Sequence, residues 1–369
     1  MLARAFALTA LMLVPGVSSA RAETAPIVLV TPLAYGTHMP GLGDSATELA
    51  SLVKERSGGS LQLDLKQPGD GTTPDEILDK VSDGKVDAGF STASFWAAKL
   101  PAAALFAGFP FGPDAKTYLD WFDNGNGRSL YQEMYDHAGI KVHVVPCAFG
   151  GAEAGGWFAK EIKSKDDLKG LRMRIFGLGA RVMAEVGVTT VLLPGGKIVS
   201  AFDKKEIDAA ELYTPAVDIE EGLKDKVKLI YMPGWHQPET VLELIVNKAR
   251  WDGLTAEQRT LLDGACKTLL QQSLADSAGL QAEALAELTA KDGVRILTWP
   301  DDVLAALKDA WGKVAKDEGD QDYFFRFVLD DIEKFTAKSA AVEGVQPSLA
   351  PPPPAQTTPA LPPAQTAQP

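Results

Sequence analysis

The chain has few of the residues that most often carry enzyme chemistry. Its 369 residues include two cysteines and four histidines, and no CxxC pair occurs. The G-x-S-x-G, H-E-x-x-H and Walker A motifs are absent as well. The histidines lack the spacing of a zinc site; they are His38, His137, His143 and His236. The sequence therefore gives no support to a serine hydrolase, a zinc enzyme or a redox dithiol.

Long apolar runs are also missing, with one short exception at the start. Residues 5–15 are mostly apolar, follow Arg4 and precede an A-x-A sequence at residues 20–22. This order is typical of a secretory signal, and the run is too short to span a bilayer. No later stretch approaches 18 apolar residues. We therefore predict a signal peptide at residues 1–22 and export of the remaining chain.

Positive charge is scarce. The chain has 36 Lys and Arg against 49 Asp and Glu, which gives a formal net charge of −13. An acidic protein without a basic stripe is a poor ligand for nucleic acid. We therefore expect no nucleic-acid partner.

The two cysteines, Cys147 and Cys266, lie far apart in the sequence. In an oxidising compartment they could form one disulfide. Two separate buried thiols fit the sequence equally well, because Cys266 lies within a helical pattern.

Apolar residues alternate between strand and helix periods. This order predicts an α/β fold with a mostly parallel sheet. A long apolar stripe predicts one helix over residues 255–290, and further helices are expected at 118–137 and 311–337. The first five elements are a strand at 26–31, a helix at 46–53, a strand at 61–65, a helix at 77–81 and a strand at 86–91.

The end of the chain has a different composition. Nine of the 24 prolines lie in residues 345–369. Such a segment cannot bury a core. We predict a disordered proline-rich tail at residues 341–369.

Two arginines stand two residues apart on a predicted strand. Arg172 and Arg174 therefore point to the same face. Ligands of α/β proteins bind beyond the carboxyl ends of strands, and a guanidinium fits a carboxylate with two charge-assisted hydrogen bonds. The spacing alone fits equally well with two surface arginines neutralised by acidic residues.

Four motifs in one order resemble the solute receptors of tripartite ATP-independent periplasmic (TRAP) transporters, the DctP family. Residues 168–174 (LKGLRMR) resemble the family's LKGLKxR segment. Residues 155–162 (GGWFAKEI) resemble the GGWFxKEI run of the subgroup that binds 2-oxo acids. Residues 207–211 (IDAAE) and 231–235 (YMPGW) resemble its IDAxE strand and YxPGW turn. The resemblance extends over residues 26–335.

This resemblance implies a two-lobed periplasmic binding protein of the type II-like class. Such proteins are α/β clamps with hinge strands and a long helix that spans both lobes. We expect the first part of lobe I at residues 23–150 and lobe II at 151–238. Residues 239–340 would return to lobe I and supply the spanning helix and the C-terminal helices.

The resemblance also implies partners. The protein would work in the periplasm with a small and a large membrane subunit of a TRAP transporter. Some relatives form a homodimer through an extended C-terminal helix. The corresponding apolar residues here are Phe324, Phe325, Phe327 and Val328, which fit equally well with packing inside the protein.

The family's binding residues map onto particular positions of this chain. Arg174 would hold the ligand carboxylate. A cation beside the ligand would be held by Glu153, by Glu211 and by the backbone carbonyl of Leu212. The chain departs from the subgroup at three positions. Glu153 replaces a glutamine, Leu212 replaces an aromatic residue, and Gln237 replaces an acid.

Charge favours the cation. Two facing carboxylates and a ligand carboxylate would bring three negative charges together, of which Arg174 can offset one. A divalent ion such as Ca²⁺ could offset two more, and oxygen ligands suit it. We therefore predict that the protein binds a small 2-oxo or 2-hydroxy acid with a bridging Ca²⁺ or Na⁺, and uses no catalytic cofactor.

Three further residues complete the expected site. Phe95 and Trp96 lie in a segment that resembles a cleft-lining part of the family, although both are equally suited to the core. Gln237 would lie near the ligand. By the same resemblance, Arg172 would be structural.

Three alternatives stay open from the sequence. Glu153 and Glu211 could receive the ammonium of an amino acid or the hydroxyls of a polyol acid, without metal. The protein could be a sensory receptor. The two glutamates could also act as acid and base in an exported hydrolase or lyase, but no nucleophile with a partner base accompanies them. We expect a binding protein rather than an enzyme.

Overall fold

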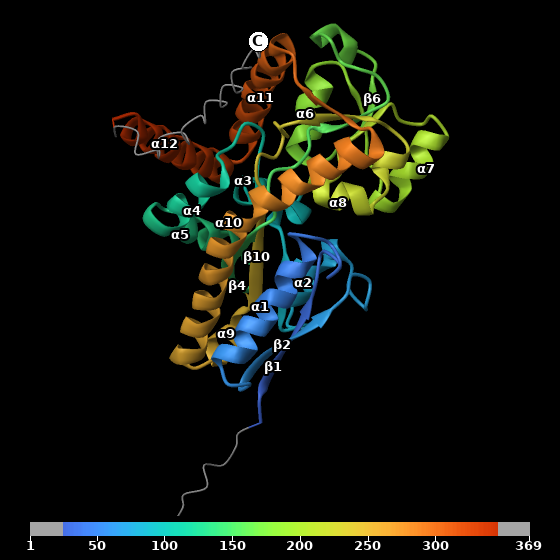
Figure 1. The fold of residues 1–369 in the computed structure, drawn as a ribbon. Coiled ribbons are helices and arrows are strands. Elements are labelled where there is room, and N and C mark those ends of the chain that lie inside the picture. Colours follow the sequence, from blue (N-terminus) through green and yellow to red (C-terminus); the bar gives the residue numbers. More distant parts are fainter. Residues whose placement is uncertain (1–24, 346–369) are drawn as a thin grey trace, which may run out of the picture.

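A computed structural model describes residues 25–345 of the chain (Figure 1). The predicted signal peptide at residues 1–22 lies outside this range, as does most of the predicted tail. Within the described range, no helix is both long and apolar enough to cross a membrane.

The first lobe, in the lower part of Figure 1, contains two small sheets. β1 and β2 pair in parallel, whereas β10 lies between β3 and β4 and is antiparallel to both. The strands are β1 (Ile27–Pro32), β2 (Leu61–Lys66), β3 (Ala88–Ser91), β4 (Val142–Phe149) and β10 (Val241–Asn247). β3 bridges in parallel to Leu33, just after β1, but its ladder with β10 is antiparallel, so the predicted mostly parallel sheet holds only in part. The local pattern cannot show that β10, from far along the chain, is inserted beside it.

Short helices cover these sheets. The predicted single helix at 118–137 is in fact two, α4 and α5, separated at Gly125 and Asn126. The helices of this lobe are α1 (Gly43–Arg56), η1 (Pro74–Glu76), α2 (Ile77–Ser82), η2 (Ala93–Trp96), α3 (Ala103–Ala107), α4 (Ala115–Asn124), α5 (Gly127–His137) and α9 (Lys248–Gly253).

The second lobe contains a six-stranded mixed sheet in the order β11-β9-β5-β8-β6-β7. Its strands are β5 (Gly156–Phe158), β6 (Arg172–Arg174), β7 (Thr189–Val191), β8 (Ala209–Ala210), β9 (Leu229–Met232) and β11 (Arg295–Thr298). β11 pairs with β9. Within the segment 239–340, expected to return to lobe I and to supply the spanning and C-terminal helices, β11 therefore joins this second sheet.

The helices of the second lobe are short. They are η3 (Lys165–Leu168), α6 (Gly177–Glu185), η4 (Gly195–Lys197), α7 (Ile198–Asp203), α8 (Pro215–Glu220) and η5 (Leu223–Asp225).

One long helix, α10 (Ala256–Asp292), spans both lobes (Figure 1). Its 37 residues extend about 55 Å at the usual rise of an α-helix. It begins with a capping box between Thr255 and Gln258 and ends at Gly293, which has a left-handed backbone. It packs against β4 and α1 of the first lobe and against α8 of the second. The predicted spanning helix is confirmed.

A disulfide ties α10 to the first lobe. Cys147 of β4 and Cys266 of α10 are bonded. The structure thus decides between the two alternatives that the sequence left open.

The chain ends in two helices rather than one, α11 (Asp301–Gln321) and α12 (Tyr323–Val345). Residues 341–345 continue α12, so the predicted tail begins too early. Of the apolar residues considered for pairing, Phe325 and Val328 are buried. Phe327 is 44% exposed.

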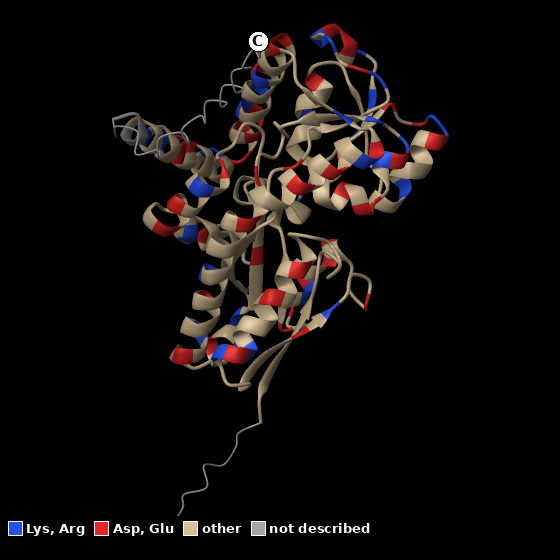
Figure 2. Ribbon diagram, viewed as in Figure 1, with Lys and Arg blue, Asp and Glu red and all other residues tan. Residues whose placement is uncertain are grey.

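Charged residues are spread over the helices of both lobes. Figure 2 shows acidic and basic residues interleaved along α10 and α11, with no continuous basic face in this view.

Two chain segments cross between the lobes side by side. One joins β4 to β5, and the other joins β9 to β10. The Gly150 amide donates to the Thr240 carbonyl at 2.7 Å, and the Gly155 amide donates to the Tyr231 carbonyl at 2.8 Å. The crossing segments therefore carry residues 150–155 and 231–240 along the boundary between the lobes.

Candidate functional site

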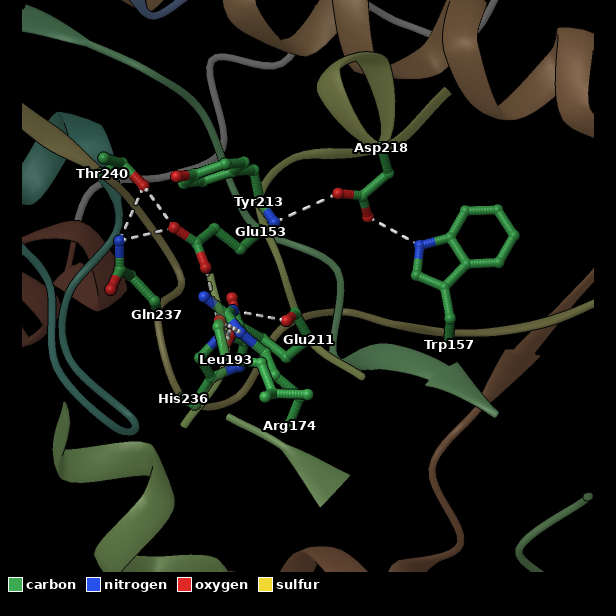
Figure 3. A network of polar contacts seen from close by, with 10 residues as sticks. All are labelled: Glu153, Trp157, Arg174, Leu193, Glu211, Tyr213, Asp218, His236, Gln237 and Thr240. Atoms are coloured by element: carbon green, nitrogen blue, oxygen red, sulfur yellow. Dashed lines mark hydrogen bonds and ion pairs between the residues drawn. The ribbon is translucent and has the colours of Figure 1, made fainter. Parts of the chain in front are cut away.

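Glu153 lies on the first crossing segment and is buried by the second. The Gly234 amide donates to the Glu153 carbonyl at 2.9 Å. A side chain at Gly234 would be blocked, because its Cβ would lie 2.4 Å from that oxygen. The Glu153 carboxylate, 3% exposed, accepts bonds at Oε1 from Gln237 Nε2 at 2.6 Å and from Thr240 Oγ1 at 3.1 Å (Figure 3).

Arg174 and Glu211 form a second buried pair, at the ends of two neighbouring strands. β6 and β8 run in parallel, with Arg174 opposite Ala210. Arg174 Nη1 donates to the Glu211 carbonyl at 2.6 Å and to Glu211 Oε2 at 3.1 Å, and Nε donates to the Leu193 carbonyl at 3.1 Å. None of these three bonds involves Nη2 of Arg174. Arg174 is 7% exposed and Glu211 is fully buried.

His236 joins the two pairs. Its Nε2 lies 3.1 Å from Glu153 Oε2 and 3.7 Å from Glu211 Oε1. One donor atom from each of the three side chains lies within 4.8 Å of the other two. Among the described residues, Glu211 Oε1 and His236 Nδ1 have no hydrogen-bond partner. Unpaired buried polar atoms are costly, and they point to a ligand, an ion or a water at this place.

The three side chains of the cluster shift one another's pKa values. Burial, with repulsion from Glu211, raises the pKa of Glu153 to about 7. Burial would also raise the pKa of Glu211, but the bond from His236 and the charge of Arg174 outweigh it and lower that pKa. Burial would lower the pKa of His236, but the two carboxylates raise it to about 9. Two cationic side chains thus face two acids in the buried cluster.

The donor atoms of this cluster can hold a cation. Two buried carboxylates converge on one point, and one oxygen of Glu211 is unpaired. Convergent oxygen donors of this kind suit Ca²⁺ or Na⁺. The residues present therefore fit a bound cation.

The other sequence-predicted residues are placed unequally. Gln237 contacts Glu153 directly, as described above. Leu212 follows Glu211, and its side chain is buried. The ring of Phe95 lies 5.8 Å from Tyr35, whose ring lies 5.6 Å from Tyr213. The roles of Leu212 and Phe95 stay predictions.

Trp96 contacts the interior of the first lobe instead. Its Nε1 donates to the Tyr135 hydroxyl at 2.8 Å. Arg172 also lies apart from the cluster, because it forms a bidentate pair with Asp208 at 2.8 and 2.9 Å, with its side chain 41% exposed.

Sequence patterns do not single out two residues of the site. The histidines lack zinc-type spacing, and the one signal for His236 is its place directly after the PGW turn. Asp218, fully buried, accepts from Trp157 Nε1 at 2.7 Å and from the Tyr213 amide at 3.1 Å (Figure 3). It thereby fixes the loop that follows Glu211.

Comparisons with known proteins agree with this architecture. A family model described as bacterial extracellular solute-binding protein, family 7 (DctP), matches residues 40–321. The monocarboxylate 2-oxoacid-binding periplasmic protein of Nostoc sp. (strain PCC 7120) is 33% identical over 290 residues, which cover 79% of each protein.

Two solved structures are similar over most of their length. A TRAP periplasmic solute-binding protein from Pseudoalteromonas atlantica T6c, with bound sodium and pyruvate, has a TM-score of 0.80 and 29% identity, covering 86% of this chain and 96% of that one. Its counterpart from Colwellia psychrerythraea, with bound calcium and pyruvate, has a TM-score of 0.81 and 27% identity, covering 87% and 97%.

These similarities confirm the two-lobed, type II-like fold. The matched family model spans most of the chain, and the family consists of solute-binding receptors rather than enzymes. This chain belongs to family 7 of the bacterial extracellular solute-binding proteins, the DctP family.

Proposed function

We propose that the protein captures a small 2-oxo or 2-hydroxy monocarboxylate in the periplasm and delivers it, chemically unchanged, to the membrane subunits of a TRAP transporter. The observation that carries this proposal is the buried Arg174, whose Nη2 is not used by its three protein bonds. Relatives that bind pyruvate support the choice of ligand.

The chemistry of capture follows from this arrangement. The guanidinium would donate to the ligand carboxylate, and closure of the lobes would exclude water and strengthen that contact. Glu153, Glu211 and the Leu212 carbonyl would hold the cation that neutralises the remaining charge and orients the ligand. Gln237 and Thr240 fix the carboxylate of Glu153 from the other side.

The division into lobes at residues 150 and 238 is part of the same proposal, with β11 assigned to the second lobe. Pairing of two copies through α12, which the sequence left open, is part of the proposal as well. It is supported by Tyr323 and Phe327, which are 69% and 44% exposed on α12. Light scattering of the purified protein would measure the number of copies.

The decisive experiment compares two arginines on one strand. Titration calorimetry with pyruvate, in the presence of Ca²⁺, would measure the affinity of Arg174→Ala and of the matched control Arg172→Ala. Loss of the buried guanidinium leaves the ligand charge unpaired and should cost about 2–5 kcal/mol, which is at least a tenfold weaker affinity. Arg172→Ala should bind as the natural chain does, since its partner is Asp208.

Two further measurements test the interpretation of this result. Arg174→Lys keeps the charge but loses the planar fork, so it should also weaken binding while preserving the ion pair with Glu211. Alanine matches pyruvate in size but carries an ammonium, so preferential binding of alanine without metal would favour the amino-acid alternative. Unchanged pyruvate affinity in both Arg174 variants would refute the proposal.

A further inference from the structure

The cation site differs in one donor from an all-oxygen site. The relatives described above hold sodium or calcium. Both ions prefer oxygen ligands. Here an imidazole nitrogen stands between the two carboxylates, 3.1 Å from Glu153 and 3.7 Å from Glu211. Imidazole is a ligand of zinc and other transition metals rather than of hard cations.

We propose that this protein takes a transition-metal dication of the Zn²⁺ class, held by Glu153 Oε2, Glu211 Oε1 and His236 Nε2. The proposal rests on the proposed function in one respect, namely that Glu153 and Glu211 hold the cation; His236 Nε2 takes the place assigned there to the Leu212 carbonyl.

Each carboxylate has one oxygen fixed and one oxygen offered. Gln237 and Thr240 hold Oε1 of Glu153, which leaves Oε2 facing His236. Arg174 holds Oε2 of Glu211, which leaves the unpaired Oε1 facing His236. Outer contacts of this kind orient metal ligands in characterised sites. The three donors thus surround one point, and an ion bound there displaces the proton of His236 Nε2 to solvent.

The spacing of the donors suits a small ion. Ligands bonded to zinc at about 2.0–2.1 Å in a tetrahedron lie about 3.3 Å from one another. The two separations from His236 Nε2, 3.1 and 3.7 Å, lie on either side of that value. Three protein ligands leave one position open, which is the arrangement of zinc sites that bind an exogenous ligand. The carboxylate or 2-oxo oxygen of the solute would occupy it.

The test compares the affinities of different metals for the chain without residues 1–22, after bound metal has been removed with a chelator. Calorimetry would measure the affinities for Zn²⁺ and Ca²⁺, and Co²⁺ would serve as a spectroscopic probe. We expect Zn²⁺ to bind at least about a hundredfold more tightly than Ca²⁺. Bound Co²⁺ should show the intense visible bands of a four-coordinate site.

His236→Gln should weaken Zn²⁺ binding at least about tenfold while changing Ca²⁺ binding little, because glutamine supplies oxygen but no imidazole. The control is His143→Gln. His143 stacks on Trp251 in the first lobe, 3.8 Å between ring centroids, so its loss should leave both affinities unchanged. The metal preference and the cobalt spectrum of the natural chain do not depend on whether a variant folds.

Three results would overturn the inference: a preference for Ca²⁺, a Zn²⁺ affinity that His236→Gln does not change, and no metal binding at all. The last would mean that a protonated His236 fills the place of the cation. None of them decides the comparison of Arg174→Ala with Arg172→Ala, which measures pyruvate binding through the guanidinium. Conversely, Zn²⁺ binding through His236 without pyruvate binding would refute the proposed function and leave this inference standing.

Discussion

Buried carboxylates occur in two regions of this protein, and they are treated in opposite ways. In the first lobe, Glu243 is fully buried, and the Tyr135 hydroxyl lies 3.1 and 3.0 Å from its two oxygens. Tyr135 accepts in turn from Trp96. Between the lobes, Glu153 and Glu211 face charged partners, and Glu211 keeps one unpaired oxygen.

This difference separates a structural acid from a binding one. A neutral hydroxyl is the partner of Glu243, and burial raises the pKa of Glu243 to about 8, so the acid is kept as a neutral group. At the lobe boundary, a guanidinium and an imidazole keep Glu211 charged. A charged group with an unused oxygen is ready to bind something further, whereas a neutral and satisfied group is not.

A disulfide also cross-links the first lobe, and removing this disulfide should give the largest loss of stability. The disulfide joins residues 119 apart in sequence. Constraint of the unfolded chain by a loop of this length contributes about 5 kcal/mol in the chain-entropy model. Cys147→Ala with Cys266→Ala should therefore lower the Tm markedly in thermal unfolding.

Pyruvate affinity provides the matching control for the disulfide. Both cysteines lie outside the cluster between the lobes, so calorimetry should find the affinity of the double variant unchanged. A Tm equal to that of the natural protein, or a clear loss of affinity, would show that the two regions are not independent in this way.

Glu243 should give a smaller effect on stability, and this effect should depend on pH. The folded pKa of Glu243, about 8, lies above the unfolded value of about 4.3. The folded chain therefore holds the extra proton between these values. The stability from this group is complete below about pH 4.3 and is lost as the pH rises towards 8, by up to a few kcal/mol.

Glu243→Gln tests this dependence, because glutamine cannot ionise but still offers an oxygen to Tyr135. The variant should match the natural protein in Tm at about pH 5 and exceed it at about pH 8. The difference between the two chains isolates Glu243 from Glu239, whose pKa is also raised by burial, to about 7. Parallel Tm curves across this range would count against a neutral Glu243.

The sequence predicted those parts of the fold that local periodicity determines. The long helix was predicted because its apolar stripe and its capping residues are local. The insertion of β10 between β3 and β4 was not, since strand pairing depends on contacts between distant segments. For the same reason, the sequence left the pairing of Cys147 with Cys266 open.

The candidate site shows the same limit. Family motifs singled out Arg174, Glu153 and Glu211, and the structure places these residues around one histidine. Spacing could not identify His236, because its partners lie far away along the chain. Trp96 shows the opposite case, since its motif resembles a cleft segment whereas its hydrogen bond lies inside the first lobe.

The smallest expected effect shows whether the position of a carboxylate, or only its charge, matters in the cluster of Glu153, Glu211 and His236. Glu153 and Gln237 lie 2.6 Å apart, and exchanging them keeps one acid and one amide. Gln237→Glu alone brings two buried carboxylates together and should lower the Tm. Adding Glu153→Gln should restore it, with a coupling of about 0.5–3 kcal/mol in a double-mutant cycle.

Zn²⁺ affinity should stay below that of the natural chain in the exchanged pair, although the exchange restores the glutamine and the acid that the resemblance implies for the subgroup's Ca²⁺ or Na⁺ site. Oε2 of Glu153 faces His236, whereas Gln237 lies on the side of Oε1. An acid at position 237 would therefore carry the same charge without offering an oxygen to the shared point. Calorimetry that found full metal affinity in the double variant would mean that net charge alone holds the ion. The site would then differ from Glu243 only in the number of nearby charges, and the direction in which Glu153 Oε2 points would not matter for metal binding.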